Sequence, residues 1–232
     1  MCLLALWVGL DPAVPLIAAA NRDEFFGRPA APPGRIEPGI VAGRDLQAGG
    51  TWLGVNRHRL FVAVTNRRQP ERTPACVSRG LLALQALGCR TLDEVEALVA
   101  RRTAAEPLAG FNLIAVSEGQ GACLHWDGTL RPVRFAAGLH VVSNNRDLDD
   151  PAMPEKKIVD AFSATQAGPP DDATLPELLR AHDGERPICK HDERYGTVSS
   201  TIYVDRRSGP RLLYAEGAPC RSPFRDYSGL LP

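Results

Sequence analysis

Two apolar runs at the start of the chain, separated by a short turn, constrain the fold more than any other feature. The first run covers residues 3–8, the second covers residues 16–20, and glycine, aspartate and proline interrupt the segment between them. Apolar runs of this length without polar alternation are typical of strands buried on both faces. The sequence therefore predicts an N-terminal hairpin of two buried strands, followed directly by the polar segment Asn-Arg-Asp-Glu-Phe at residues 21–25.

Cys2 stands immediately before the first of these strands. Removal of Met1 by an aminopeptidase, which a second residue as small as cysteine permits, gives Cys2 both a thiol and a free α-amino group. An α-amino group has an ordinary pKa of about 8, so part of it is unprotonated at neutral pH and can accept the thiol proton. The Met1-Cys2 pair thus predicts the chemistry of an N-terminal nucleophile.

Length and charge limit the class of protein. The 232 residues, 44% of them hydrophobic, fit one large domain spanning residues 1–232. The 27 basic and 27 acidic residues balance, and no basic run predicts a nucleic-acid-binding face. Residues 1–8 lack a basic leader and the apolar run breaks at residue 9, so we expect neither a signal peptide nor a membrane span, and predict a cytoplasmic protein.

The six cysteines, at positions 2, 76, 89, 123, 189 and 220, contain no Cys-x-x-Cys pair. Their spacing matches neither a zinc knuckle nor a compact disulfide scaffold. We therefore expect free, mostly buried thiols in a reducing compartment and no metal site.

The rest of the chain predicts strands and grouped helices. Residues 28–38 are rich in proline and predict a loop. Helices are expected over residues 78–87, 91–102, 154–163 and 175–182, the second of them opened by a Thr91–Glu94 capping box. Residues 49–55 predict a tight turn entering a strand, and further strands are expected over residues 60–65, 111–117, 122–127, 139–143, 199–205 and 212–215. Hairpin-connected strands with grouped helices predict an α+β fold of two mainly antiparallel sheets, although periodicity does not separate this from a two-layer fold.

Several motifs, weak singly but specific as a set, resemble the NRDE family, which is named for its Asn-Arg-Asp-Glu motif and includes transport and Golgi organisation protein 2. They are Met1-Cys2-Leu3-Leu4, residues 21–25 with Arg28-Pro29, Gly43-Arg44-Asp45, residues 49–55, Thr65-Asn66-Arg67, Ser143-Asn144-Asn145 and Tyr195-Gly196-Thr197. The resemblance covers nearly the whole chain. It implies a relative of the N-terminal-nucleophile hydrolases, and hence a four-layer αββα sandwich of two antiparallel sheets flanked by helices.

The resemblance also implies roles for single residues. Cys2 would be the nucleophile, Arg22 and Asp23 would position it, and Asn66 and Asn144 would stabilise the oxyanion. Further substrate contacts would come from Asn21, Trp52, Asn145 and Arg194. Arg194 is included because the family segment after Tyr195 often places an arginine where this chain has Val198.

Each of these residues also has a structural interpretation. Cys2 would be a small apolar residue, Arg22-Asp23 an ion pair closing the hairpin, Asn66 and Asn144 turn residues, and Trp52 a core side chain.

The resemblance implies a cysteine amidohydrolase or acyltransferase acting on an amide, ester or acyl-thioester, with no cofactor required. The alternative is a non-catalytic carrier on the same scaffold that binds or mobilises haem, acyl-lipid or acyl-CoA. Haem needs an axial ligand, for which Cys2 and the five histidines are the candidates. A third alternative, an interaction role without pocket chemistry, has no heptad repeat or charged tail to support it. The sequence leaves the substrate and the oligomeric state open.

Overall fold

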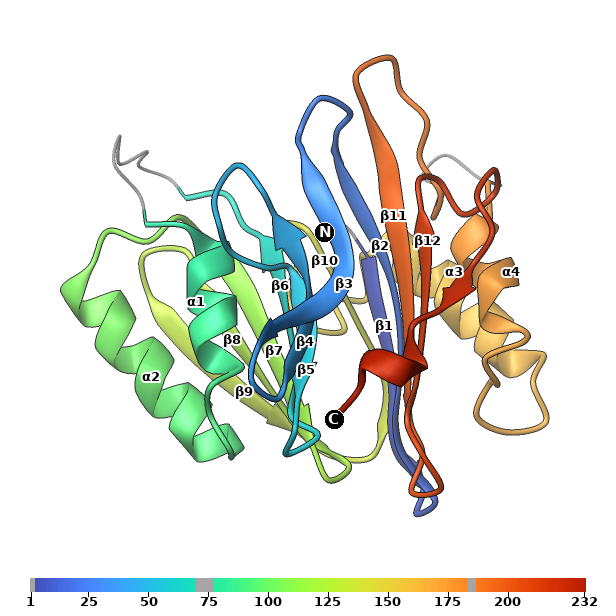
Figure 1. The fold of residues 1–232 in the computed structure, drawn as a ribbon, viewed down its shortest axis with the longest axis horizontal. Helices are drawn as coiled ribbons and strands as arrows, with labels where there is room; N and C mark the ends of the chain where they lie inside the picture. The colour runs from blue at the N-terminus through green and yellow to red at the C-terminus, as the bar shows by residue number, and fades with distance from the viewer. Residues whose placement is uncertain (1–2, 70–76, 183–186) are drawn as a thin grey trace. The chain divides into compact units, whose positions relative to one another are not determined.

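The computed structural model describes residues 3–69, 77–182 and 187–232 (Figure 1). The chain divides into two compact units. Unit 1 comprises Met1–Arg28 and Ala137–Gly229, and unit 2 comprises Pro29–Ala136 and Leu230–Pro232. Each unit has its own sheet and its own helices, and the assignment of residues 1–232 to a single domain stays a prediction.

Unit 1 contains, within the described residues, a six-stranded antiparallel sheet in the order β10-β1-β2-β11-β12-β13. The strands are β1 (Leu3–Asp11), β2 (Val14–Phe25), β10 (Gly138–Ser143), β11 (Tyr195–Asp205), β12 (Arg211–Glu216) and β13 (Arg225–Asp226). The predicted hairpin is confirmed as β1 and β2, with Leu3 opposite Asn21. The β1–β2 hairpin from the start of the chain therefore lies inside this sheet, and the strands on either side of it come from the second half of the chain.

Helices α3 (Pro154–Ala164) and α4 (Leu175–Arg180) pack on one face of this sheet. Leu3, Ala5 and Trp7 of β1 contribute to the core on that face, and the indole N–H of Trp7 donates a hydrogen bond of 3.1 Å to Ser163 Oγ. The residues between them, such as Leu6, are equally buried. Burial on both faces explains why the apolar runs of β1 and β2 show no alternation.

Unit 2 contains a seven-stranded antiparallel sheet, counted over its described residues, in the order β3-β4-β5-β6-β7-β8-β9. The strands are β3 (Ala30–Glu37), β4 (Ile40–Asp45), β5 (Leu53–Asn56), β6 (Phe61–Asn66), β7 (Phe111–Ser117), β8 (Gln120–Trp126) and β9 (Leu130–Phe135). Helices α1 (Arg79–Ala86) and α2 (Leu92–Ala105) cover one face (Figure 1), and a short 3₁₀ turn, η1 (Ser228–Leu230), lies near the end of the chain.

The cap of α2 follows the sequence prediction with one shift. Thr91 Oγ1 accepts a hydrogen bond from Glu94 N at 3.2 Å. The Glu94 carboxylate in turn accepts from Arg90 N at 2.7 Å, one residue earlier than in a standard capping box. The bond from Glu94 N satisfies one of the backbone donors that helix formation leaves unpaired.

The loop predicted at residues 28–38 is wrong, because most of it forms β3. This strand lies at the edge of the sheet and has no neighbouring strand on its outer side, so a proline without an N–H costs no inter-strand hydrogen bond there. The two prolines at positions 32 and 33 fall in an irregularity of the register between Ala31 and Gly34. Proline therefore limits which strand this segment can form but does not prevent one.

Further elements differ from the prediction. Strand β9, at the opposite edge of the same sheet, was not predicted, because its exposed and charged residues give no apolar signal. Strands β4 and β13 were not predicted either. Helix α4 ends at Arg180, two residues before the predicted end. None of the helices in residues 3–69, 77–182 and 187–232 combines the length and the apolar character that crossing a bilayer would require.

Candidate functional site

The sequence-predicted residues Asn21, Arg22 and Asp23 lie in β2, near the middle of the unit 1 sheet, with exposed fractions of 0%, 5% and 2%. Successive strand residues point to opposite faces. Asn21 and Asp23 therefore share the face of Ile17, which packs against the helices, and Arg22 lies on the other face. The structure does not bring the Arg22 and Asp23 side chains together as one pair.

Asn21 holds three segments of unit 1 together. Its Nδ2 donates to the carbonyl oxygens of Leu179 and Ile188, both at 3.0 Å, and its Oδ1 accepts from Ser200 Oγ at 2.5 Å. Both groups of the amide are thus used within the fold. A contact between Asn21 and substrate stays a prediction.

Asp23 is held by two partners that the sequence analysis missed. Its Oδ1 accepts from Thr197 Oγ1 of β11 at 2.7 Å, and its Oδ2 lies 3.2 Å from Lys190 Nζ. Thr197 Oγ1 also accepts from Lys190 N at 2.9 Å, and Lys190 Nζ lies 3.7 Å from Glu155 Oε1. A buried carboxylate needs such partners to offset its desolvation. Thr197 was part of a quoted motif, but no sequence signal distinguished Lys190.

Arg22 lies opposite Ser199 of β11 in the sheet register. Its positive charge acts on Tyr214 of β12, where burial raises the pKa of the phenol while Ser199 and Arg22 oppose that rise. Between Thr197 and Ser199 the register with β2 shifts, and Val198 falls in this irregularity. Arg22, Ser199 and Tyr214 therefore form a polar group on the face of the sheet opposite the helices.

Two more predicted residues, Asn144 and Asn145, follow the end of β10, at the end of the unit 1 sheet where Asn21 lies. Leu3 lies opposite both Ser143 of β10 and Asn21 of β2, and Asn144 and Asn145 follow Ser143 directly. Asn144 is half-buried, and Asn145 is exposed with φ 61°, a left-handed conformation that asparagine tolerates. Asn145 therefore has a turn role, and its predicted contact with substrate stays a prediction.

Arg194 is exposed and immediately precedes β11. Its carbonyl oxygen accepts a hydrogen bond of 3.1 Å from Phe26 N, which joins the ends of β2 and β11. Cys2 lies outside the described residues, so its predicted role has no geometry here.

The other two predicted residues belong to unit 2. Trp52 is buried, with 7% of its surface exposed, and its ring packs over Gly43 so closely that an added Cβ would lie 2.4 Å from it. Asn66 is the last residue of β6, opposite Phe111.

Beside Asn66, Thr65 belongs to a buried network. Asn112 Nδ2 donates to Thr65 Oγ1 at 2.9 Å, and His125 Nδ1 lies 2.7 Å from Asn112 Oδ1.

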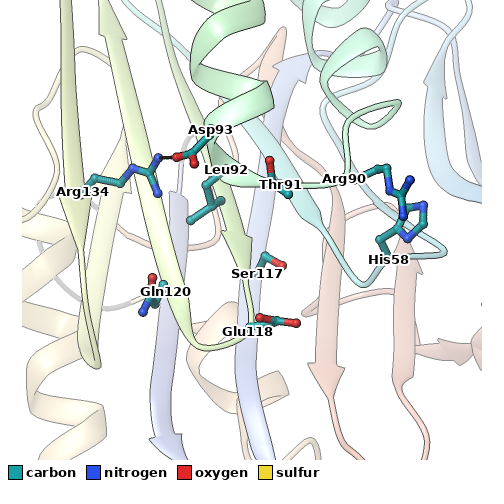
Figure 2. Close-up of a pocket in the computed structure, with 9 residues that line it drawn as sticks. All are labelled: His58, Arg90, Thr91, Leu92, Asp93, Ser117, Glu118, Gln120 and Arg134. Carbon is teal, nitrogen blue, oxygen red and sulfur yellow. Dashed lines mark hydrogen bonds and ion pairs between the residues drawn. The ribbon is translucent and has the colours of Figure 1, made fainter.

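Each unit has a pocket of about 460 Å³. In unit 2 the pocket lies between the start of α2 and the turn joining β7 to β8, and Figure 2 shows Arg134 reaching toward Asp93, with which it forms an ion pair. None of the predicted catalytic or substrate-binding residues lines it, although His58, one of the candidate haem ligands, does. The unit 1 pocket is lined by Glu155, His182, Pro187, Cys189, Lys190, His191 and Asp192. Through Lys190 this second pocket adjoins Asp23.

Two cysteines and two histidines gather beside the unit 1 pocket: His182, Cys189, His191 and Cys220. Burial raises the pKa of Cys189 to about 11, with the neighbouring Cys220 adding to the shift. Burial also lowers the pKa of His191, together with the charges of Arg221 and His182. This group was not predicted from the sequence, although its two histidines were candidate haem ligands, because its only local signal is the single-residue spacing of Cys189 and His191.

A family model described as transport and Golgi organisation 2 matches residues 1–167. The chain belongs to the transport and Golgi organisation 2 family. The Bos taurus homolog is 34% identical, with 82% of this chain and 81% of that protein covered, and the Mus musculus homolog is 28% identical, with 84% and 83% covered. Membership in the transport and Golgi organisation 2 family confirms the resemblance drawn from the sequence motifs.

Two solved structures resemble this member of the transport and Golgi organisation 2 family over most of its length. One is a Caenorhabditis elegans N-acylethanolamine-hydrolyzing acid amidase ortholog, with TM-score 0.61 and 11% identity over 87% of this chain and 92% of that one. The other is the C2A mutant of conjugated bile acid hydrolase from Clostridium perfringens, with TM-score 0.55 and 9% identity over 98% and 96%. At these identities the likeness is evidence of fold alone, and it confirms the predicted N-terminal-nucleophile hydrolase-like fold.

Proposed function

We propose that this chain is an N-terminal-nucleophile cysteine amidohydrolase or acyltransferase that acts in the cytoplasm on an amide, ester or acyl-thioester. The observation that carries the proposal is the burial of Arg22 in β2 of a sheet whose fold is shared with amide hydrolases. Burying a guanidinium costs several kcal/mol in desolvation. A stable anion beside it, such as a thiolate, offsets that cost.

The strand register supports Cys2 as the source of that anion. Leu3, which follows Cys2 in the sequence, lies opposite Asn21, which precedes Arg22. Asn144 follows Ser143, which also lies opposite Leu3. A cationic neighbour lowers the pKa of a thiol and so increases the fraction present as the nucleophilic thiolate.

The proposed reaction has two stages. The Cys2 thiolate attacks the substrate carbonyl carbon, a C–S bond forms, and the carbonyl π electrons move to oxygen, where the side-chain amide of Asn144 donates a hydrogen bond. Collapse of this intermediate breaks the bond to the leaving amine, alcohol or thiol, which takes a proton from the α-ammonium group. Water or an acceptor nucleophile then cleaves the acyl-cysteine and returns its proton to the amine. The oxyanion role expected of Asn66, a residue of unit 2, stays a prediction.

In this scheme Asp23, Thr197 and Lys190 have positioning roles. Asp23, through Thr197 and Lys190, fixes β2 against β11 and the segment before it. This fixes the register in which Arg22 lies opposite Ser199. Trp52, Asn145 and Arg194 stay proposed substrate contacts.

The first test is an intact mass of the purified full chain before and after treatment with a thiol-directed acylating probe. The proposal expects loss of Met1 and one acyl adduct mapped to Cys2, with the adduct absent in Cys2→Ala and retained in Cys89→Ala, a half-buried thiol of unit 2. The substrate panel begins with an N-acylethanolamine and a conjugated bile acid, after the two structural relatives, and an acyl-CoA.

Retained Met1 with no selective adduct contradicts the proposal. Unchanged turnover in Cys2→Ala does so as well. In either case the carrier alternative is tested next, by titrating the chain with haem and with acyl-CoA and following the haem absorption band and the intrinsic fluorescence.

A further inference from the structure

Four side chains with metal-binding atoms converge at one point of unit 1. His182 follows α4, Cys189 and His191 precede β11, and Cys220 follows β12. Their ligand atoms all lie within 4.8 Å of one another, and both cysteines are free thiols. Three separate chain segments therefore contribute to one Cys₂His₂ group.

Three of the six ligand–ligand distances, those among Cys189, His191 and Cys220, lie near the values expected around a tetrahedral zinc ion, and the distances to His182 are within 4.8 Å. Zn–S bonds of about 2.3 Å and Zn–N bonds of about 2.0–2.1 Å place two sulfur ligands about 3.8 Å apart, and a sulfur and a nitrogen about 3.5 Å apart. The Cys189 and Cys220 sulfurs are 3.7 Å apart, and Cys189 Sγ lies 3.5 Å from His191 Nε2. His191 Nε2 lies 3.2 Å from Cys220 Sγ.

The backbone around the ligands is held in place without a metal. Cys189 N donates to Ala181 O at 2.9 Å, which fixes the chain beside His182. Arg180 Nε donates to Pro219 O at 2.9 Å, and a turn in which Arg221 N and Ser222 N both donate to Ala218 O contains Cys220. The rings of His182 and His191 stack with centroids 5.0 Å apart. The ligands are thus presented by segments that are already tied to each other.

Ligand chemistry and charge favour zinc over harder cations. Thiolate and imidazole ligands select zinc, whereas magnesium and calcium prefer oxygen. Two thiolates neutralise a divalent ion, so the bound site adds no net charge next to Arg221. The same two sulfurs could form a disulfide only if they moved to about 2.05 Å, well inside their present separation.

We propose that His182, Cys189, His191 and Cys220 bind a structural zinc ion. All four positions of the tetrahedron are protein ligands, which is typical of structural sites and leaves no place for a catalytic water. The ion would fasten the segment containing Lys190, the partner of Asp23, to the turn after β12. The inference is independent of the proposed acyl chemistry.

The test measures metal in the full chain, produced without a histidine tag and without chelators, under reducing conditions. We expect about one zinc per chain by elemental analysis, matched by zinc released to a chromogenic chelator after thiol modification. Replacement by cobalt(II) should give the visible bands of a tetrahedral site and a near-ultraviolet thiolate-to-cobalt band. His182→Ala and Cys220→Ser should each weaken zinc affinity at least about tenfold, because each removes a ligand.

Two control variants distinguish zinc bound by these four residues from zinc bound by a thiol elsewhere in the chain. Cys89→Ser, which changes a half-buried thiol of unit 2, and Cys2→Ala should both keep wild-type zinc content, so failure of the acyl chemistry would leave the metal result intact. Since His182 is exposed, His182→Ala keeps the test open if a cysteine variant fails to fold.

A chain that binds no zinc under reducing conditions overturns the proposal. So does zinc content unchanged in both ligand variants. A Cys189–Cys220 disulfide in peptides from protein kept reduced would likewise replace the metal site with a redox cross-link.

Discussion

Asn21→Asp tests how far the buried amide of β2 stabilises unit 1. The substitution keeps the size of the side chain but replaces the Nδ2 donor with an oxygen that faces the carbonyls of Leu179 and Ile188, each 3.0 Å away. Two buried acceptors lose their donor, at about 1–3 kcal/mol each, and a fully buried carboxylate adds its own desolvation cost. We therefore expect a loss of about 3–6 kcal/mol, a large part of a typical folding free energy of about 5–15 kcal/mol.

The assay is urea unfolding at neutral pH, followed by tryptophan fluorescence and by far-ultraviolet circular dichroism. Asn145→Asp is the matched control, because it makes the same chemical change at an exposed turn residue and should shift the free energy of unfolding by less than about 0.5 kcal/mol. If the free energy of unfolding of Asn21→Asp lies within about 1 kcal/mol of the wild-type value, the three hydrogen bonds of Asn21 contribute less to stability than their burial predicts.

Three further changes test other parts of the structure. Lys190→Met removes the cation between Asp23 and Glu155 and should cost about 2–4 kcal/mol of unfolding free energy, because the Asp23 carboxylate is only 1% exposed while Lys190 itself is 24% exposed. Lys156→Met breaks a helical pair with Asp160, whose carboxylate is 47% exposed, and should cost less than about 0.5 kcal/mol; equal losses in the two variants would contradict this prediction. Burial acts to raise the pKa of Asp172, but the hydrogen bond from Arg206 and the charge of Arg211 outweigh burial and lower that pKa. The carboxylate therefore contributes its full stability above about pH 4, and this contribution is lost as the pH falls through the lowered pKa. Asp172→Asn should flatten the acid limb of a plot of unfolding free energy against pH, and an unchanged acid limb would refute this prediction. Gly43→Ala places a Cβ 2.4 Å from the Trp52 ring and should lower the free energy of unfolding by about 1–3 kcal/mol, whereas Gly34→Ala, with nothing within 4 Å, should be near neutral in the same urea titration.

The sequence predicted the elements whose signals are local. The unbroken apolar runs of β1 and β2 reflect burial on both faces, and Thr91 with Glu94 marks the start of α2 in the chain itself. The edge strands β3 and β9 were beyond such reasoning, because an edge position tolerates proline and charge that would exclude a central strand.

The polar contacts of the site depend on register and on distant segments. Lys190 meets Asp23, and Cys220 meets Cys189, only after β11 has paired with β2 and the segment before it has folded back. Nothing in the spacing of Cys189 and Cys220 along the chain indicates that proximity. Motif resemblance identified Arg22 and Asp23, but the alternation of a strand places them on opposite faces, which the tripeptide alone does not reveal.

The pairing of β2 with β11 also sets an order of events during synthesis. The N-terminal hairpin belongs to a sheet whose other central strand ends at Asp205, while unit 2 is built almost entirely from the contiguous segment 29–136. At about 5–20 residues per second, the ribosome needs roughly 10–35 s after the hairpin emerges to supply β11. The apolar hairpin must be kept from aggregating for that time.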